Sequence, residues 1–244
     1  MTPNSFPFVN WAIMIMFPKY KLMYIRPWKT GSTSLLEILR QNFGPAQSYH
    51  CESRPGHAYI RDIEDDPNRE YYQYLHDWYV ITTIRNPLTW LVSQYNWSIR
   101  LATTGKNYDN YKTPGSYVHK AHYKVAKMTF PEFIQSRYRM ALGYPFYDLD
   151  KHPDKPGVFP RWDQTFTNRW DHHCINLRIR TEDRETGIRE LFNHYNKEWN
   201  GQDYQLNSSG KDWDIDEWYT KALRKKVEYI HEDDFKYYYP EYLL

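Results

Sequence analysis

The sequence has only two cysteines, Cys51 and Cys174, among its 244 residues. Two are too few for a disulfide framework or a four-cysteine zinc site, and reduced thiols or a single bridge both remain open. A strong charge of either sign is also absent, because 32 basic and 30 acidic side chains leave a net charge of +2. The near balance gives no reason to expect attraction to nucleic acid or to a membrane surface, so any anion site has to be local.

Long apolar runs are missing too. The longest, residues 11–17, is far too short to cross a bilayer. Residues 1–4, Met-Thr-Pro-Asn, lack the positive charge with which a signal peptide begins. We therefore expect a soluble, cytoplasmic protein that binds no nucleic acid and spans no membrane.

Apolar and aromatic side chains, in contrast, are abundant. Hydrophobic residues make up 41% of the chain, and aromatic residues make up 18%. A single core can keep growing to a chain length of about 250 residues, so we predict one domain over residues 1–244. The aromatic rings suit the interior of that domain and also stacking on sugars and bases.

The first strand and helix are predicted early in the chain. Residues 21–26 are short and apolar and precede a proline, which is typical of a buried strand. Ser34 and Glu37 have the spacing of a capping box at a helix start. Gly44 stands where that helix would end.

A second pair of elements follows. Residues 78–84 are rich in β-branched and aromatic side chains and predict a strand, and residues 88–99 predict a helix. The alternation of strand and helix predicts an α/β fold, a P-loop-like three-layer sandwich with a central parallel sheet flanked by helices. Ligands of such sheets bind at the carboxyl ends of the strands. Three further helices are predicted: one capped by Thr129 and Glu132 and running through Tyr138, one over residues 185–195 and one over residues 215–229.

The loop after the first strand has the composition of an anion site. Residues 28–34 read Trp-Lys-Thr-Gly-Ser-Thr-Ser and lead into the first helix. Gly31 permits close approach of the backbone, the helix start offers N–H groups, and Lys29 adds a positive charge. The loop is not a Walker A sequence, because Lys29 precedes the glycine. The alternative interpretation is an ordinary helix start beside a surface lysine.

A second cluster lies at the end of the second predicted strand. Arg85 follows that strand directly, Asn86 and Pro87 turn the chain, and Ser93 lies on the next helix. A guanidinium can bind a phosphate through two hydrogen bonds, and a serine can add another. The alternative is an arginine at a sheet edge and a serine on a helix.

Taken together, Lys29-Thr-Gly-Ser-Thr-Ser34, Arg85-Asn-Pro87 and Ser93-Gln-Tyr95 resemble the two motifs that bind 3′-phosphoadenosine-5′-phosphosulfate (PAPS) in the sulfotransferase superfamily. The closest resemblance is to the carbohydrate-type branch, which includes heparan sulfate 2-O-sulfotransferase and bacterial relatives. The resemblance assigns the 3′-phosphate to Arg85 and Ser93. It assigns the 5′-phosphosulfate to Lys29, Thr30, Gly31, Ser32, Thr33 and Ser34.

The resemblance extends more weakly over residues 21–240. Residues 56–63 resemble a family segment that carries a histidine, here His57, and residues 207–209 and 234–240 resemble late family segments. One departure concerns Trp28, which separates Lys29 from the proline that directly precedes the lysine in most members.

The activity that this resemblance implies is transfer of a sulfuryl group from PAPS to a hydroxyl acceptor by in-line displacement, with 3′-phosphoadenosine-5′-phosphate (PAP) as product. Lys29 would stabilise the leaving group. His57 would act as the general base, with His50 and His76 as the next candidates, because imidazole titrates near neutral pH. No metal is required in this scheme.

The acceptor is expected to bind at the irregular segments within residues 102–163, and family analogy favours a saccharide. Two alternatives are a small-molecule kinase and a non-catalytic module that binds adenosine phosphates or glycans. The oligomeric state is not readable from the sequence. The residues proposed for an anionic or sugar-containing acceptor are Lys106, Lys112, Lys120, Lys124, Lys127, Tyr108, Tyr111 and Tyr117.

Overall fold

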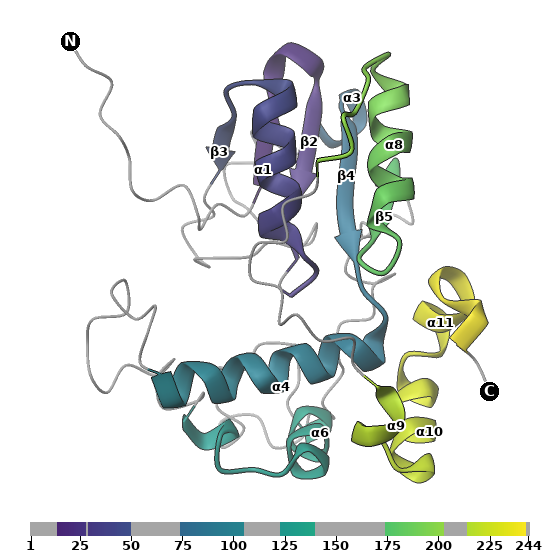
Figure 1. Cartoon of the computed structure of the whole chain (residues 1–244). Helices are drawn as coiled ribbons and strands as arrows, with labels where there is room; N and C mark the ends of the chain where they lie inside the picture. The colour runs from purple at the N-terminus through teal and green to yellow at the C-terminus, as the bar shows by residue number, and fades with distance from the viewer. Residues whose placement is uncertain are drawn as a thin grey trace. The chain divides into compact units, whose positions relative to one another are not determined.

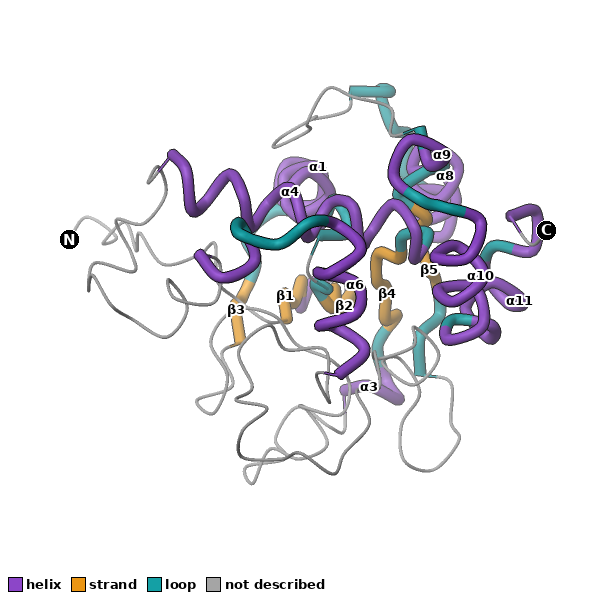
Figure 2. Tube along the Cα trace, turned by 90° about the horizontal axis from the view of Figure 1, so that it is seen from below, coloured by secondary structure: helices purple, strands orange, loops and turns teal. Residues whose placement is uncertain are grey.

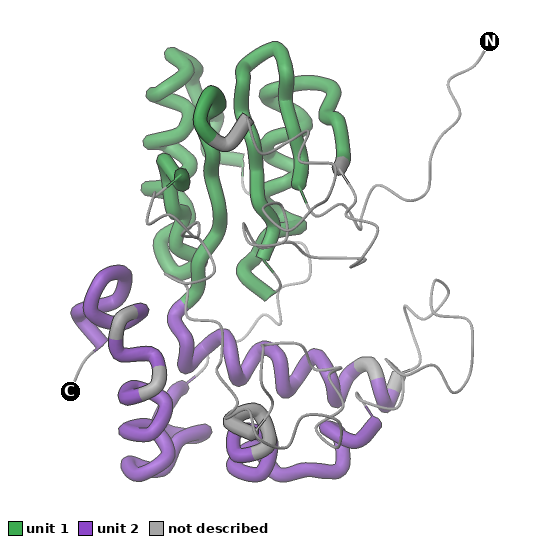
Figure 3. Tube along the Cα trace, turned by 180° about the vertical axis from the view of Figure 1, so that it is seen from behind, with its two compact units in different colours: residues 1–85, 162–211 green, residues 86–161, 212–244 purple. Residues whose placement is uncertain are grey.

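The computed structural model divides into two compact units, which Figure 3 distinguishes by colour. Unit 1 comprises residues 1–85 and 162–211, and unit 2 comprises residues 86–161 and 212–244. The single domain predicted from the chain length stays a prediction. The structure describes residues 14–27, 29–49, 74–104, 123–139, 174–202 and 214–242.

Unit 1 is built on a five-stranded mixed sheet with the order β3-β1-β2-β4-β5 (Figure 1). The neighbours β2 and β4, and β4 and β5, are parallel, whereas β1 is antiparallel to both β2 and β3. The predicted α/β fold and the two predicted strands, β2 and β4, are therefore confirmed, and an antiparallel edge adds to the parallel part. The strands are β1 Met14–Phe17, β2 Leu22–Ile25, β3 Gln47–Tyr49, β4 Tyr79–Ile84 and β5 Leu177–Arg180.

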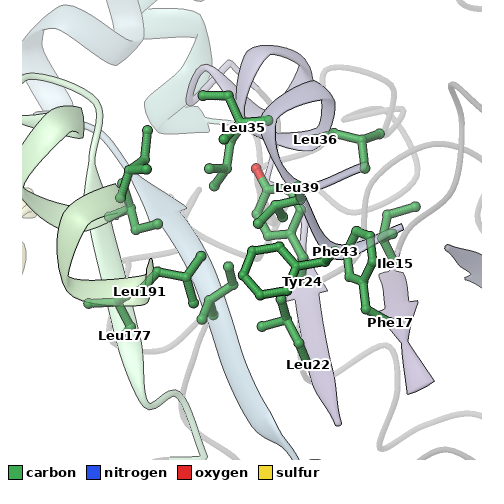
Figure 4. Close-up of a cluster of buried hydrophobic side chains, with 14 of the residues drawn as sticks. Ile15, Phe17, Leu22, Tyr24, Leu35, Leu36, Leu39, Phe43, Leu177 and Leu191 are labelled. Atoms are coloured by element: carbon green, nitrogen blue, oxygen red, sulfur yellow. The ribbon is translucent and has the colours of Figure 1, made fainter. Parts of the chain in front are cut away.

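Two helices cover one face of this sheet. The helices α1 (Ser32–Phe43) and α8 (Arg184–His194) lie on the same side of the strands (Figure 2). Their apolar side chains pack with every second strand residue, including Leu22 and Tyr24 of β2 (Figure 4). The alternate residues of β2, Met23 and Ile25, are fully buried as well. Burial of both faces is the usual condition of strands in a parallel sheet.

Close packing sets the position of α8 on β5. A Cβ atom placed on Gly187 would lie only 2.9 Å from Cγ2 and 3.2 Å from Cα of Ile179. Real Cβ atoms do not approach that closely, so only glycine lets the helix lie at this distance from the strand. The predicted helix over residues 185–195 is confirmed by α8.

The start of α1 differs from the prediction. The helix begins at Ser32, and its N-cap is Gly31 with a φ of 70° and no side-chain cap bond. The predicted Ser34–Glu37 capping box is therefore wrong, and Glu37 instead accepts a hydrogen bond from Gln41. The predicted end is confirmed, because Gly44 adopts a φ of 79° and its N–H bonds to the carbonyl of Arg40.

Unit 2 is helical in its described part. The predicted cap of α6 is confirmed, since Glu132 accepts from the N–H of Thr129 at 2.7 Å and Thr129 Oγ1 accepts from the N–H of Glu132 at 3.4 Å. No helix in the described ranges is long and apolar enough to cross a membrane. The elements are α4 Pro87–Thr104, α6 Phe130–Arg139, α9 Ile215–Trp218, α10 Lys221–Ile230, α11 Glu232–Tyr238 and the 3-10 helix η5 Pro240–Tyr242.

The single helix predicted over residues 215–229 is wrong, because the chain breaks between α9 and α10. Tyr219 is extended at the break, and its hydroxyl donates to the carbonyl of Leu88 on α4 at 2.9 Å. Thr220 then caps α10 by accepting from the N–H of Leu223. A tertiary hydrogen bond and a new cap thus interrupt the helix at residues 219 and 220.

Aromatic rings form part of the core of unit 2. Tyr95, Phe130, Phe133, Trp218 and Tyr219 make edge-to-face and tilted contacts, with centroids 5.1–6.2 Å apart. These separations are typical of favourable aromatic pairs. Part of the aromatic excess in the sequence therefore serves packing.

Candidate active site

Lys29 and Arg85, one residue from each predicted anion-binding cluster, meet in unit 1 at the carboxyl ends of two neighbouring strands. Because β2 and β4 are parallel neighbours, with Ile25 opposite Thr82, their carboxyl ends lie side by side. The loop that contains Lys29 follows β2, and Arg85 follows β4. Nη1 of Arg85 donates to the carbonyl of Lys29 at 3.3 Å. Both side chains are partly exposed, so a ligand can reach them.

Two residues of the loop have backbone conformations that suit an anion cradle. Lys29 and Gly31 both have positive φ angles, 64° and 70°. Left-handed residues in such a turn direct successive N–H groups into a concave surface that suits an anion. For Lys29, which has a Cβ, this conformation costs about 1–2 kcal/mol relative to the right-handed one. Bonds to the rest of the unit must therefore hold the loop.

A chain of buried hydroxyl groups supplies part of that support. Thr30 Oγ1 donates to the carbonyl of Pro27 at 3.0 Å, so its oxygen accepts from Thr83 of β4, 2.6 Å away. Tyr24 OH lies 3.3 Å from Thr83 Oγ1 and also 3.3 Å from the carbonyl of Ser32, to which it donates. Burial raises the pKa of Tyr24 to about 12, so the phenol stays protonated and able to donate.

The same hydrogen bonds engage the hydroxyl of Thr30 within the protein. The side chain of Thr30 is completely buried and faces β4. Of the residues assigned to the 5′-phosphosulfate, Ser32 and Ser34 are also buried, whereas Lys29, Gly31 and Thr33 are partly exposed. Thr30 would therefore contact a ligand through its backbone.

Thr181, which no sequence motif identified, ties the loop to the end of β4. Its Oγ1 donates toward the carbonyls of Thr30, at 3.0 Å, and Ile84, at 2.9 Å. Its N–H also bonds to Ile84, the residue before Arg85, at 2.8 Å. Residues 177–180, Leu-Arg-Ile-Arg, alternate apolar and charged side chains. This pattern could have predicted β5, and with it the position of Thr181 at the carboxyl end of a strand.

A further positive charge lies at the end of β2. Arg26 follows the strand directly and is only 3% exposed. Burial lowers the pKa of Arg26 because a low dielectric disfavours the charged form. An arginine nevertheless keeps its proton in proteins. Arg26, Lys29 and Arg85 thus all follow the carboxyl ends of β2 and β4, in a chain whose net charge is only +2.

Other predicted residues belong to unit 2 or lie outside the described ranges. Ser93 is on α4 of unit 2 and is nearly buried, with 9% exposure. His57, His50, Trp28, Cys51 and most of residues 102–163 are not described. His76 is exposed on the short helix α3 (Tyr74–Asp77), and Cys174 is buried. Among the described side chains, no group of three His, Cys, Asp or Glu residues could hold a metal ion.

Residues 13–240 match the family model described as the Sulfotransferase family. The chain therefore belongs to this family and is an enzyme that transfers sulfuryl groups. The predicted resemblance to sulfotransferases is confirmed at this level, and the assignment to the carbohydrate-type branch stays a prediction. No curated protein and no solved structure matched the chain.

The role of Thr181 predicts a specific loss of stability. Thr181→Val keeps the shape of the side chain but removes the hydroxyl that donates to the carbonyl of Thr30. The carbonyl of Ile84 keeps its bond to the N–H of residue 181. We expect the free energy of unfolding, measured by urea titration, to fall by about 1 kcal/mol. Thr103→Val is the control, because that hydroxyl is exposed and bonds within its own helix. Its effect should stay within about 0.5 kcal/mol, and equal losses would contradict the connecting role.

Proposed function

We propose that the sulfuryl donor of this enzyme is PAPS and that the site at the carboxyl ends of β2 and β4 binds it. The observation that carries the proposal is the contact between the two clusters, in which Arg85 donates to the carbonyl of Lys29. A donor with a phosphosulfate at one end of the ribose and a phosphate at the other needs two anion sites on one rigid frame. Family membership supports the choice, since sulfotransferases generally use PAPS.

The 5′-phosphosulfate would lie on the loop from Lys29 to Ser34. The positive φ angles of Lys29 and Gly31 suit binding through backbone N–H groups. The N–H of Ser34 bonds to the carbonyl of Gly31 at 3.1 Å, so the anion would bind nearer the start of the loop. The Lys29 ammonium would neutralise the bridging oxygen as its bond to sulfur breaks.

The 3′-phosphate would bind Arg85 together with Ser93. A guanidinium has five N–H donors, so a bond from Arg85 to Lys29 is compatible with two more to a phosphate. That bond also orients the guanidinium before the ligand arrives, which lowers the entropic cost of binding.

The transfer step follows from these roles. The acceptor oxygen attacks sulfur in line, an O–S bond forms, the bond from sulfur to the bridging oxygen breaks, and PAP leaves. We propose His57 as the base that takes the proton of the acceptor hydroxyl. We propose a saccharide acceptor, bound by the lysines and tyrosines of residues 102–163, on family analogy.

Thermal stabilisation by PAP tests the donor site. PAP at 100 times its dissociation constant should add about 2.7 kcal/mol to the free energy of unfolding and raise the melting temperature by several degrees. ADP and 5′-AMP, at the same concentration, lack the 3′-phosphate and should give smaller shifts. An equal or larger shift with ADP would overturn the PAPS proposal and favour a nucleotide kinase.

Lys29→Ala tests the leaving-group role. Transfer of radiolabelled sulfate from PAPS should fall by at least roughly 100-fold, the effect of losing one preorganised charge stabiliser. Suitable acceptors are chemically desulfated heparin, desulfated chondroitin and neutral dextran, which also test the saccharide proposal. Lys19→Ala is the control, because Lys19 is exposed on the 3-10 helix η2 (Pro18–Tyr20). Equal rates for the two variants would contradict the role of Lys29.

Two glycines provide a matched test of the loop backbone. Gly31 and Gly201 have φ angles of 70° and 77°, and an added Cβ would meet nothing closer than 3.6 Å at either. Alanine at each position should therefore cost about 1–2 kcal/mol of stability for conformational reasons alone. Calorimetric titration should show roughly tenfold weaker binding of PAP, equivalent to about 1.4 kcal/mol, for Gly31→Ala only. Equal PAP affinities would argue against backbone binding at Gly31.

A further inference from the structure

Arg184 lies against the anion loop, although neither the motifs nor the resemblance identified it. It is the first residue of α8, and a Cβ placed on Gly31 would lie 3.6 Å from its Nη1. Cγ2 of Thr181, which bonds to the loop, is at the same distance from that point. Arg184 is partly exposed to solvent.

An electrostatic effect on Tyr24 agrees with this position of Arg184. The positive charge of Arg184 acts on the hydroxyl of Tyr24 and opposes the larger effect of burial on its pKa. That hydroxyl donates to the carbonyl of Ser32, the first residue of α1. Because Gly31 is also the N-cap of α1, the distance of 3.6 Å from its Cβ position places the guanidinium near both the left-handed glycine and the helix start, the two backbone features that suit an anion.

The position of Arg184 is set by rigid parts of unit 1. Thr181, three residues earlier, bonds to the loop and to the end of β4. Gly187, three residues later, packs against the backbone of β5. Glu185, the neighbouring acid in the first turn of α8, binds Arg189 through bonds of 2.6 and 2.9 Å. These contacts hold the start of the helix at the loop and direct one nearby carboxylate toward another arginine.

We propose that Arg184 binds the 5′-phosphate group of the nucleotide, as a second cation beside Lys29. This inference rests on the proposed function, because it assumes a nucleotide of the PAP type in the loop. A planar guanidinium can bind two phosphate oxygens at once, whereas the Lys29 ammonium is a point charge. Arg184 thus orients the 5′ group, and Lys29 stabilises charge on the bridging oxygen.

Ligands that differ in one phosphate provide the test. PAP has a 3′-phosphate and a 5′-phosphate. The nucleotide 3′-AMP has only the 3′-phosphate, which Arg184 would not contact. Arg184→Gln should weaken PAP binding roughly 10- to 100-fold, the effect of a charged hydrogen bond, and leave the affinity for 3′-AMP within about twofold. Calorimetric titration measures both. The control is Lys225→Gln, which removes an exposed positive charge on α10 and should leave both affinities unchanged.

The outcomes separate this inference from the proposed function. Wild type that binds PAP no better than ADP contradicts the proposed function itself. If the wild-type protein prefers PAP to ADP and Arg184→Gln binds PAP as tightly as the wild type does, only the role of Arg184 is overturned. Equal weakening of PAP and 3′-AMP also overturns it, because a disturbed fold affects both ligands alike. If Arg184→Gln does not fold, Arg184→Lys replaces it and should show a smaller loss confined to PAP.

Discussion

The parallel pairing of β2 and β4 is the constraint on which the rest of the site depends. It brings the loop that follows β2 and Arg85, which follows β4, to the same end of the sheet, where both strands have their carboxyl ends. The hydrogen bond between Thr30 and Thr83, both fully buried, then ties the loop to the neighbouring strand. A register shift of one residue would turn Thr83 to the other face of the sheet and break that bond.

The energetics of the loop explain why so many hydroxyl groups surround it. The left-handed conformation of Lys29 costs about 1–2 kcal/mol, and one hydrogen bond contributes only about 0.5–1.5 kcal/mol net. A single bond therefore does not dependably offset the backbone cost. The structure has several, from Thr30 to Pro27 and Thr83, from Thr181 to Thr30, and from Arg85 to Lys29. Together they can hold the concave backbone in place before any ligand binds.

Local patterns in the sequence predicted some parts of the fold and of the candidate site, but not others. The apolar runs predicted β2 and β4, and the motifs after them predicted that Lys29 and Arg85 would lie together. These patterns could not predict the role of Thr181, because its hydroxyl bonds to the carbonyl of Thr30, which is 151 positions away in the sequence. The predicted helix over residues 215–229 was wrong for a similar reason, because Tyr219 bonds to Leu88, 131 positions away. Local pattern and propensity do not encode contacts of this kind, whereas the fold does.

The division of the chain has a consequence for ligand binding. Arg85 is the last residue of unit 1 before the chain enters unit 2, and Asn86 begins unit 2 by accepting the N–H of Leu88 at the start of α4. Ser93 is on that same helix. The loop and Arg85 both belong to unit 1, so a nucleotide that they hold would stabilise that unit by its binding energy. A role of Ser93 in binding stays a prediction.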